Sequence, residues 1–236
     1  MTEGERAEMR ITPIAHIRTD FPEKFGIPRQ PGVVEELKGR IAFEPEYRNP
    51  DMIRGLEEFS HIWLIWEFSK NLADDGSSKF SPTVRPPRLG GNKRIGVFAT
   101  RSPFRPNPLG LSVVKIDHVE SDTPEGPVIH VKGADMVDGT PIYDIKPYIP
   151  YADSIPGAKG GFTDDMEYKT LKVVWKLEDI PDAVKDSLEK ILSNDPRPHY
   201  QNDPDRVYGM SYAGYEVKFK VTGEVLAVLS VVKSCN

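Results

Sequence analysis

Alternating apolar residues predict a chain built mainly of short β-strands. The clearest case is the segment 60–68, in which one face carries only apolar residues, Ile62, Leu64, Trp66 and Phe68. The opposite face carries Trp63 and Ile65, so both faces are largely apolar. A strand that is apolar on both faces is typical of the centre of a sheet. We therefore expect residues 60–68 to form a central strand.

Other short runs of the same kind predict further strands, at residues 10–18 with a break at Pro13, 40–43, 95–100, from 111 to 119, 128–133 and 142–148. A short helix is expected from Asn49 to about Glu58, because Asn49 can cap it and Pro50 takes the first helical position. Many short strands separated by turn signals, with little helix before residue 152, favour a closed antiparallel β-barrel over a sandwich.

The pattern changes after Tyr151, where residues 152–161 have the composition of a linker. Beyond the linker we expect a strand at 171–177, a helix at 181–193, and paired strands at 215–221 and 225–232. The sequence thus predicts a mainly β protein with two domains, an antiparallel barrel at residues 1–152 and a small α+β domain at residues 165–236.

A proline-rich loop is predicted between the strands that end near residue 100 and begin at residue 111. Three prolines, Pro103, Pro106 and Pro108, fix their own φ angles and restrict the residue before each of them. The loop also carries Arg101, Arg105 and Asn107, whose side chains bind anions and planar polar groups. A stiff loop with such side chains is typical of a binding surface whose ordering entropy is lost on folding.

The charge of the chain is strongly segregated around this loop. Residues 76–116 contain no Asp or Glu but eight basic residues, Lys79, Arg85, Arg88, Lys93, Arg94, Arg101, Arg105 and Lys115. The whole chain carries a formal net charge of −5, so its remainder is acidic. One cationic face on an acidic protein is expected for a polyanionic ligand such as RNA. The alternative is a loop with solvated arginines and no partner.

Several classes of protein receive no support from the composition. The chain has a single cysteine, Cys235, and no apolar run long enough to span a membrane. Its first residues contain no apolar signal region, so we expect a cytoplasmic protein. The five histidines have no ligand spacing, and we predict no metal. No Gly-x-Gly-x-x-Gly motif follows an early strand, which argues against a Rossmann-type cofactor site.

Three carboxylates gather between residues 134 and 144, at Asp135, Asp138 and Asp144. They can serve merely as electrostatic balance to the basic loop. A cluster of this kind is also what a bound cation, such as a sulfonium, would select. From the residues alone, the chain is a β-rich protein with a cationic, proline-stiffened loop.

Ordered motifs run along nearly the whole chain: Pro-Arg-Gln-Pro-Gly at 28–32, Arg-Gly-Leu-Glu at 54–57 with Phe-Ser-His at 59–61, the segments 83–91 and 96–112, and Asp-Gly-Thr-Pro at 138–141 followed by Asp-Ile-Lys-Pro-Tyr at 144–148. They resemble the TsaA-like or TrmO family of S-adenosylmethionine-dependent tRNA methyltransferases. Residues 195–200 and 206–208 resemble that family's small tail domain.

The resemblance implies a β-barrel methyltransferase of the non-Rossmann kind that forms a homodimer. Its expected substrate is the anticodon stem-loop of threonine-accepting tRNA, in which it would methylate N6 of N6-threonylcarbamoyladenosine beside the anticodon. Carried over position by position, the contacts to S-adenosylmethionine would be Gln30, Pro31, Gly32, Ser69, Lys70, Arg101, Leu111, Asp138, Gly139, Thr140 and Pro141. At Ser69, similar members of the family often have a histidine.

Two residues are the candidates for catalysis. Asn107, with nearby backbone carbonyls, would accept a hydrogen bond from N6–H and orient that nitrogen; its alternative role is that of a turn former before Pro108. Asp144, or Asp138, would take the proton or stabilise the cation. Arg105 would pair with the threonyl carboxylate, and Arg85, Arg88 and Lys146 are further candidates for binding the substrate.

A competing hypothesis is an RNA-binding β-barrel without catalytic activity. Such a protein would use the same cationic face, but it would not need S-adenosylmethionine. Binding of that cofactor therefore separates the two hypotheses.

Overall fold

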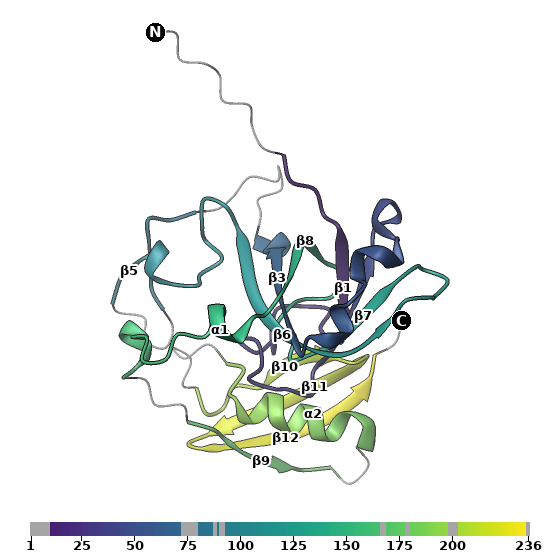
Figure 1. The fold of residues 1–236 in the computed structure, drawn as a ribbon. Coiled ribbons are helices and arrows are strands. Elements are labelled where there is room, and N and C mark those ends of the chain that lie inside the picture. Colours follow the sequence, from purple (N-terminus) through teal and green to yellow (C-terminus); the bar gives the residue numbers. More distant parts are fainter. Residues whose placement is uncertain are drawn as a thin grey trace.

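A closed antiparallel β-barrel forms the N-terminal two thirds of the protein (Figure 1). The computed structural model describes residues 10–71, 80–86, 89, 93–165, 169–177, 180–197 and 203–234. The barrel consists of β1 (Ala15–Thr19), β2 (Lys38–Phe43), β3 (His61–Glu67), β6 (Leu109–Glu120), β7 (Val128–Lys132) and β8 (Thr140–Pro147), and its strand order is β1-β2-β7-β6-β3-β8. The predicted mainly β fold with an antiparallel barrel is confirmed.

Strand β3 has the central position that its apolar faces predict. It pairs with β6 on one side and with β8 on the other. Ile62, Leu64 and Trp66 point into the barrel core and are buried, whereas Trp63 and Ile65 on the other face are only partly buried. The same alternation along β1, β2 and β7 fills the rest of the barrel, so that burial of apolar side chains on one face holds the strands together.

The region between β3 and β6 departs from the predicted strand at residues 95–100. Only β5 (Ile95–Gly96) is extended there, and it pairs with the equally short β4 (Thr83–Val84). The chain then turns into a 3-10 helix, η6 (Val97–Ala99), whose first residue donates its backbone N–H to the carbonyl of Pro82. The basic segment that precedes β6, called the basic loop below, therefore lies beside the barrel as a small subdomain. The prediction was a barrel strand followed by a turn.

The predicted helix at residues 49–58 is also interrupted. The side chain of Asn49 accepts a hydrogen bond from the backbone N–H of Asp51 at 3.0 Å, as expected for a cap. However, the segment forms two 3-10 helices, η2 (Pro50–Ile53) and η3 (Leu56–Glu58), because Gly55 between them has a φ of 85°, in the left-handed region. Further short helices among the described residues are η1 (Pro45–Tyr47), η4 (Ser69–Asn71), α1 (Pro150–Asp153) and η7 (Gly161–Thr163).

A second sheet follows the barrel and is covered by one helix (Figure 1). Its order is β10 (Tyr208–Tyr212), β11 (Tyr215–Thr222), β12 (Val225–Lys233) and β9 (Lys172–Trp175), and the helix is α2 (Asp182–Ser193). Strand β10 was not predicted, because its alternation of Tyr208, Met210 and Tyr212 with Gly209 and Ser211 spans only five residues. A two-residue turn joins it to β11, in which Ala213 and Gly214 both have positive φ.

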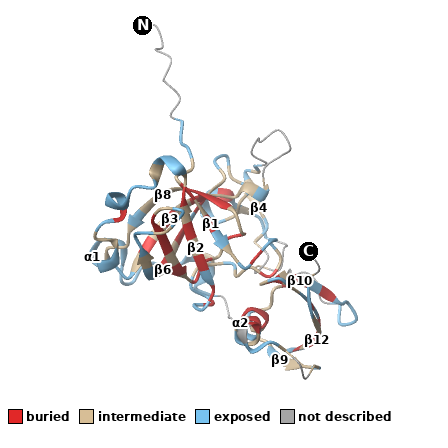
Figure 2. Ribbon diagram, turned by 90° about the vertical axis from the view of Figure 1, so that its right-hand side faces the viewer, coloured by how far each residue is buried: buried red, intermediate tan, exposed pale blue. Residues whose placement is uncertain are grey.

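The segment between β1 and β2 belongs to the core of this second sheet. Phe21, Val34 and Leu37 are buried in the same cluster as the inner residues of α2 and of β10, β11 and β12. Figure 2 shows buried residues both within the barrel and along the inner side of α2. The segment is thus fixed between the barrel and the second sheet. The exact domain boundaries at 1–152 and 165–236 stay a prediction.

In the part of the chain that the structure describes, no helix has the length and apolar character needed to cross a membrane.

A close approach between β3 and β6 yields the first testable prediction. Gly110 lies directly opposite Trp66, and a methyl group at Gly110 would come within 2.3 Å of the indole ring. We expect Gly110→Ala to lower the free energy of unfolding by about 1–3 kcal/mol, because the ring has to move from its packed position. Urea unfolding followed by circular dichroism measures the change.

Gly96→Ala is the matched control, since an added Cβ at Gly96 meets no atom within 4 Å. Equal stability of the two variants would show that the packing of Trp66 against Gly110 does not constrain the barrel.

Candidate active site

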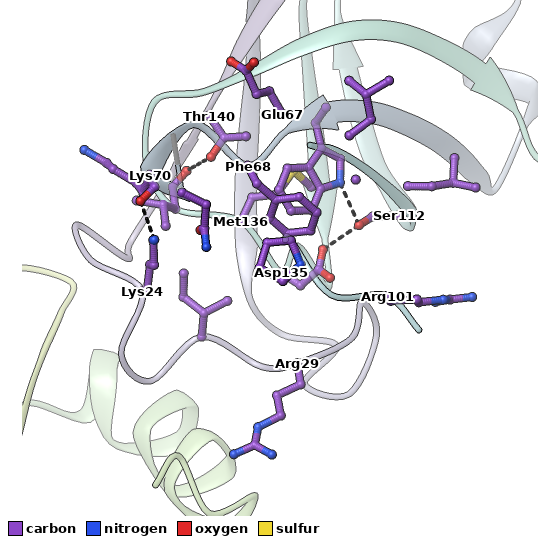
Figure 3. A pocket seen from close by; sticks show the side chains of 18 of the residues that line it. Lys24, Arg29, Glu67, Phe68, Lys70, Arg101, Ser112, Asp135, Met136 and Thr140 are labelled. Carbon is purple, nitrogen blue, oxygen red and sulfur yellow. Dashed lines mark hydrogen bonds between the residues drawn. The ribbon is translucent and has the colours of Figure 1, made fainter. Parts of the chain in front are cut away.

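A cavity of about 560 Å³ opens at one end of the barrel (Figure 3). Its wall combines the segment 27–31 with the end of β3 and residues 68–71, the loop at 100–105, the first residues of β6, and the segment 135–140. These segments are far apart in the sequence, and the barrel brings them together. The volume is within the range of pockets that enclose a small molecule.

Side chains from two neighbouring strands and the segment after β7 form a hydrogen-bonded chain in this cavity. The indole N–H of Trp66 donates to Ser112 Oγ at 3.0 Å, and Ser112 Oγ donates to Asp135 Oδ1 at 2.8 Å. Ser112 is buried and lies on β6, two residues after Gly110. Ser112 accepts a hydrogen bond from Trp66 and donates its one hydroxyl proton to Asp135. This arrangement favours the ionised form of the Asp135 carboxyl group, which can only accept hydrogen bonds.

Burial raises the pKa of the Asp135 carboxyl to about 6. The hydrogen bond from Ser112, the backbone N–H of Asp135 and the positive charge of Arg101 each oppose that rise. The carboxyl is thus mostly ionised at neutral pH in spite of its enclosed position. Such a group inside a cavity is a candidate for a functional role.

Arginine and glutamine close one side of the cavity. Arg101 donates from Nη1 to Gln30 Oε1 at 2.6 Å, which links the basic loop to the segment between β1 and β2. Arg105, which also lines the cavity, donates from Nη1 to the carbonyls of Val97 and Thr100, at 3.1 and 2.7 Å. Its guanidinium lies over the ring of Phe98, 5.7 Å from the centroid. Arg105 thereby ties its own loop together.

A wider hollow of about 1160 Å³ adjoins the cavity and shares Arg29, Gln30, Thr100, Arg101 and Pro103 with it. Its lining also includes two further arginines, Arg85 and Arg94. Two aromatic rings here are unusually accessible, since Phe98 is 77% exposed and Phe104 is 43% exposed. Cationic groups interleaved with exposed rings suit a single-stranded nucleic acid, because the rings can stack on bases while the arginines bind phosphates.

Comparison with known proteins decides the family. The model of the tRNA-methyltransferase O N-terminal domain matches residues 16–154, and that of the TrmO C-terminal domain matches residues 162–234. The chain belongs to the TrmO family.

Relatives of known name agree with this assignment. A tRNA (adenine(37)-N6)-methyltransferase from Escherichia coli is 37% identical over 89% of this chain and 92% of its own length. One of the same name from Eikenella corrodens is 46% identical over 69% of this chain and 91% of its own length. The crystal structure of TrmO from Pseudomonas aeruginosa superposes with a TM-score of 0.76 at 31% identity and covers 98% of this chain and 100% of that chain.

The cofactor contacts implied by the TrmO resemblance fall into two groups. Those that line the cavity are Gln30, Pro31, Ser69, Lys70, Arg101, Leu111 and Thr140. Those that are not among its lining residues are Gly32, Asp138, Gly139 and Pro141. Members of the second group shape the wall instead: Asp138 accepts a hydrogen bond from the backbone of Thr19, and the backbone N–H of Gly32 donates to Gly133.

The two predicted catalytic residues do not line the cavity. Asn107 is exposed at the end of the basic loop. Asp144 lies on β8 and forms an ion pair with Lys146, in which Nζ and Oδ2 are 3.1 Å apart. The structure therefore brings together Asp144 and Lys146, but neither with Asn107 nor with the cavity. Their roles in catalysis and in substrate binding stay predictions.

Two of the four predicted substrate-binding residues line the depressions, whereas Lys146 lines neither. Arg105 lines the cavity and Arg85 lines the wider hollow. Arg88 lies outside the described residues. Asp135 was predicted only as part of an acidic cluster. Ser112 and Trp66 were not predicted to belong to the site. Their contact depends on the register of β3 with β6, which alternation alone does not specify.

Histidines that were expected to be scattered meet on the outside of the barrel. His118 and His130 stack with their centroids 4.1 Å apart, and a carboxylate oxygen of Glu120 lies 3.4 Å from Nε2 of each ring. These three residues have ligand atoms close enough for a shared metal ion, although their spacing in the sequence does not indicate such a site. They do not line the cavity. The predicted absence of a metal stays a prediction.

The contacts of Arg105 lead to a prediction that separates two roles. If it mainly holds the loop, Arg105→Lys should speed amide hydrogen exchange in residues 97–105, because an ammonium group cannot replace the planar guanidinium between the two carbonyls and the Phe98 ring. Hydrogen exchange followed by mass spectrometry measures this. Exchange that stays at the wild-type rate, together with weaker tRNA binding, would assign Arg105 to the substrate alone, as the sequence suggests.

Proposed function

We propose that this chain methylates N6 of N6-threonylcarbamoyladenosine in threonine-accepting tRNA, with S-adenosylmethionine as the methyl donor. At the coarser level it is an S-adenosylmethionine-dependent tRNA (adenine(37)-N6)-methyltransferase, as the family and its named relatives indicate. The observation that supports the finer assignment best is the adjacency of two depressions. One holds the carboxylate of Asp135 beside the rings of Trp66 and Phe68, and the other combines Arg85 and Arg94 with the exposed rings of Phe98 and Phe104.

The cavity at the end of the barrel fits the cofactor in size and chemistry. S-Adenosylmethionine supplies an electrophilic methyl group on a cationic sulfur. The residues around the cavity offer aromatic rings from Trp66 and Phe68, the carboxylate of Asp135, and polar groups from Gln30 and Ser69. The main contribution of the protein to such a displacement is to hold the methyl donor and the nucleophile in line, which can supply about 7–11 kcal/mol.

The open hollow suits an anticodon loop. Bases of such a loop are already unpaired, so that little energy is needed to turn one of them toward the cavity. The exposed rings of Phe98 and Phe104 offer stacking surfaces for neighbouring bases. Arg101, at the border of the two depressions, and Arg105 present guanidinium groups to which the carboxylate of a threonylcarbamoyl group would bind.

The alternative is a barrel that binds RNA without catalysis. It explains the cationic hollow but gives no reason for a second cavity with a buried carboxylate beside two aromatic rings. The cavity therefore favours the enzyme. Binding of S-adenosylmethionine, measured by calorimetry, separates the two functions.

We also propose that the protein is cytoplasmic and forms a homodimer. Tyr151 and Ile155, which follow β8, are 90% and 72% exposed and are apolar groups that a second copy would cover. Light scattering tests the assembly: a monomer mass at micromolar concentration would contradict it. Fractionation of cells tests the location.

Methylation of tRNA tests the function itself. Incubation with S-adenosylmethionine and threonine-accepting tRNA should produce methylated N6-threonylcarbamoyladenosine, measured by mass spectrometry of the nucleosides. The same tRNA without the threonylcarbamoyl group is the control and should react far less. In this assay Asn107→Ala should lower kcat by roughly 10² if Asn107 orients N6. Equal methylation of both tRNAs would contradict the finer assignment.

Salt dependence tests the cationic hollow. We expect the affinity for an anticodon stem-loop to fall with log salt at a slope of about −0.7 to −0.9 for each phosphate contact. Arg85→Ala should reduce the slope by about one contact, because Arg85 lines the hollow. Lys115→Ala is the control, since this exposed lysine belongs to the same basic segment but does not line the hollow. Identical slopes for Arg85→Ala and the parent protein would place the RNA elsewhere.

A further inference from the structure

Asp135, one of the three carboxylates of the acidic cluster, is the member of that cluster that lines the cavity. It lies between β7 and β8, in the segment that leads to Thr140, and is only partly accessible. Figure 3 shows its carboxyl group directed toward Ser112, with the ring of Phe68 beside it. The cavity is lined by this residue on the side where β6 begins.

The surroundings of Asp135 are mainly aromatic and apolar. The rings of Trp66 and Phe68 meet edge to face with centroids 4.3 Å apart, and both line the cavity. Met136, the next residue, is buried and also lines it. A carboxylate beside aromatic rings is suited to a cation that needs no hydrogen-bond acceptors, because rings and charge attract it without directed bonds.

Charged groups from several elements face the same cavity. Arg101 of the basic loop acts on Asp135 directly and lowers its pKa. The other charged residues of the lining are Lys24, Arg29, Glu67, Lys70 and Arg105. Arg101 donates a hydrogen bond to Gln30 and forms no hydrogen bond or ion pair with Asp135 among the contacts of the described residues. Asp135 keeps a negative charge that a ligand can use.

We propose that Asp135 binds the positive charge of the sulfonium group and makes the cavity prefer S-adenosylmethionine over S-adenosylhomocysteine. The proposal rests on the proposed function. An ammonium group fits this position less well, because it has three N–H donors to satisfy, whereas Asp135 Oδ1 already accepts from Ser112 and the neighbouring side chains Phe68 and Met136 offer no strong acceptors. Ser112 and Trp66 act as positioning residues that fix the carboxyl group.

The charge preference assists turnover. On methyl transfer, N6 supplies the electron pair of the new N–C bond and releases its proton to water, while the electron pair of the broken C–S bond stays on the sulfur. The sulfur is then neutral, and its attraction to Asp135 is lost. Release of the product is thereby favoured over release of the unreacted cofactor.

The ratio of two dissociation constants tests the proposal on the wild-type protein. Calorimetry from pH 5 to pH 8 gives Kd for S-adenosylmethionine and for S-adenosylhomocysteine, which share every other group. The raised pKa of Asp135, about 6, predicts that the preference is present above pH 6 and falls below it, by at most about tenfold for each pH unit. A ratio that stays constant across this range overturns the proposal.

A variant gives the second test. In Asp135→Asn, the affinity for S-adenosylmethionine should fall by about tenfold or more, while that for S-adenosylhomocysteine should change little. Asp117→Asn, which removes a carboxylate paired with Lys132 outside the cavity, is the control and should keep the preference. An equal loss for both ligands would assign Asp135 to a group that they share.

The outcomes also separate this proposal from the proposed function. If the wild-type protein binds neither ligand, the cofactor site itself is elsewhere and the function fails. If it binds both and methylates tRNA without any charge preference, only the role of Asp135 fails. Should Asp135→Asn not fold, as judged by thermal unfolding, the pH dependence of the wild-type ratio still decides.

Discussion

The indole ring of Trp66 is the element on which the geometry of the cavity depends. The ring lies against Gly110 of the neighbouring strand β6, whose missing side chain leaves room for it. The ring then contributes an aromatic wall, and its N–H fixes Ser112, which in turn holds Asp135. One packing contact in the barrel thus sets both the shape of the cavity and the orientation of its carboxylate.

A second constraint is the attachment of the basic loop. Arg101 connects the basic loop to Gln30, and Arg105 donates hydrogen bonds to two backbone carbonyls within the loop, those of Val97 and Thr100. Because these contacts use side chains that also line the cavity, they connect the loop that is suited to meet RNA to the proposed cofactor site. The prolines of the loop reduce the conformations that remain, so the site is largely formed before a ligand arrives.

Much of the barrel could be predicted from the sequence because alternation is a local signal: β3 and β6 are where their apolar residues place them. The failures have tertiary causes. Gly55 interrupts the expected helix through its positive φ, and the loop contacts shorten the strand expected at 95–100. The burial of Phe21 in the second core is invisible in the alternation. Family motifs identified seven residues of the cavity wall as cofactor contacts, and the acidic cluster included Asp135, but the contact of Ser112 with Trp66 required the strand register.

The central claim is that the cavity at the end of the barrel binds S-adenosylmethionine with its sulfur facing Asp135. A crystal structure of the protein with this cofactor tests it most directly. We predict that the sulfur lies between the carboxyl group of Asp135 and the rings of Trp66 and Phe68, with the methyl group directed toward the hollow that contains Arg85 and Phe98. A cofactor bound outside this cavity, or bound with its amino group at Asp135, would contradict the account.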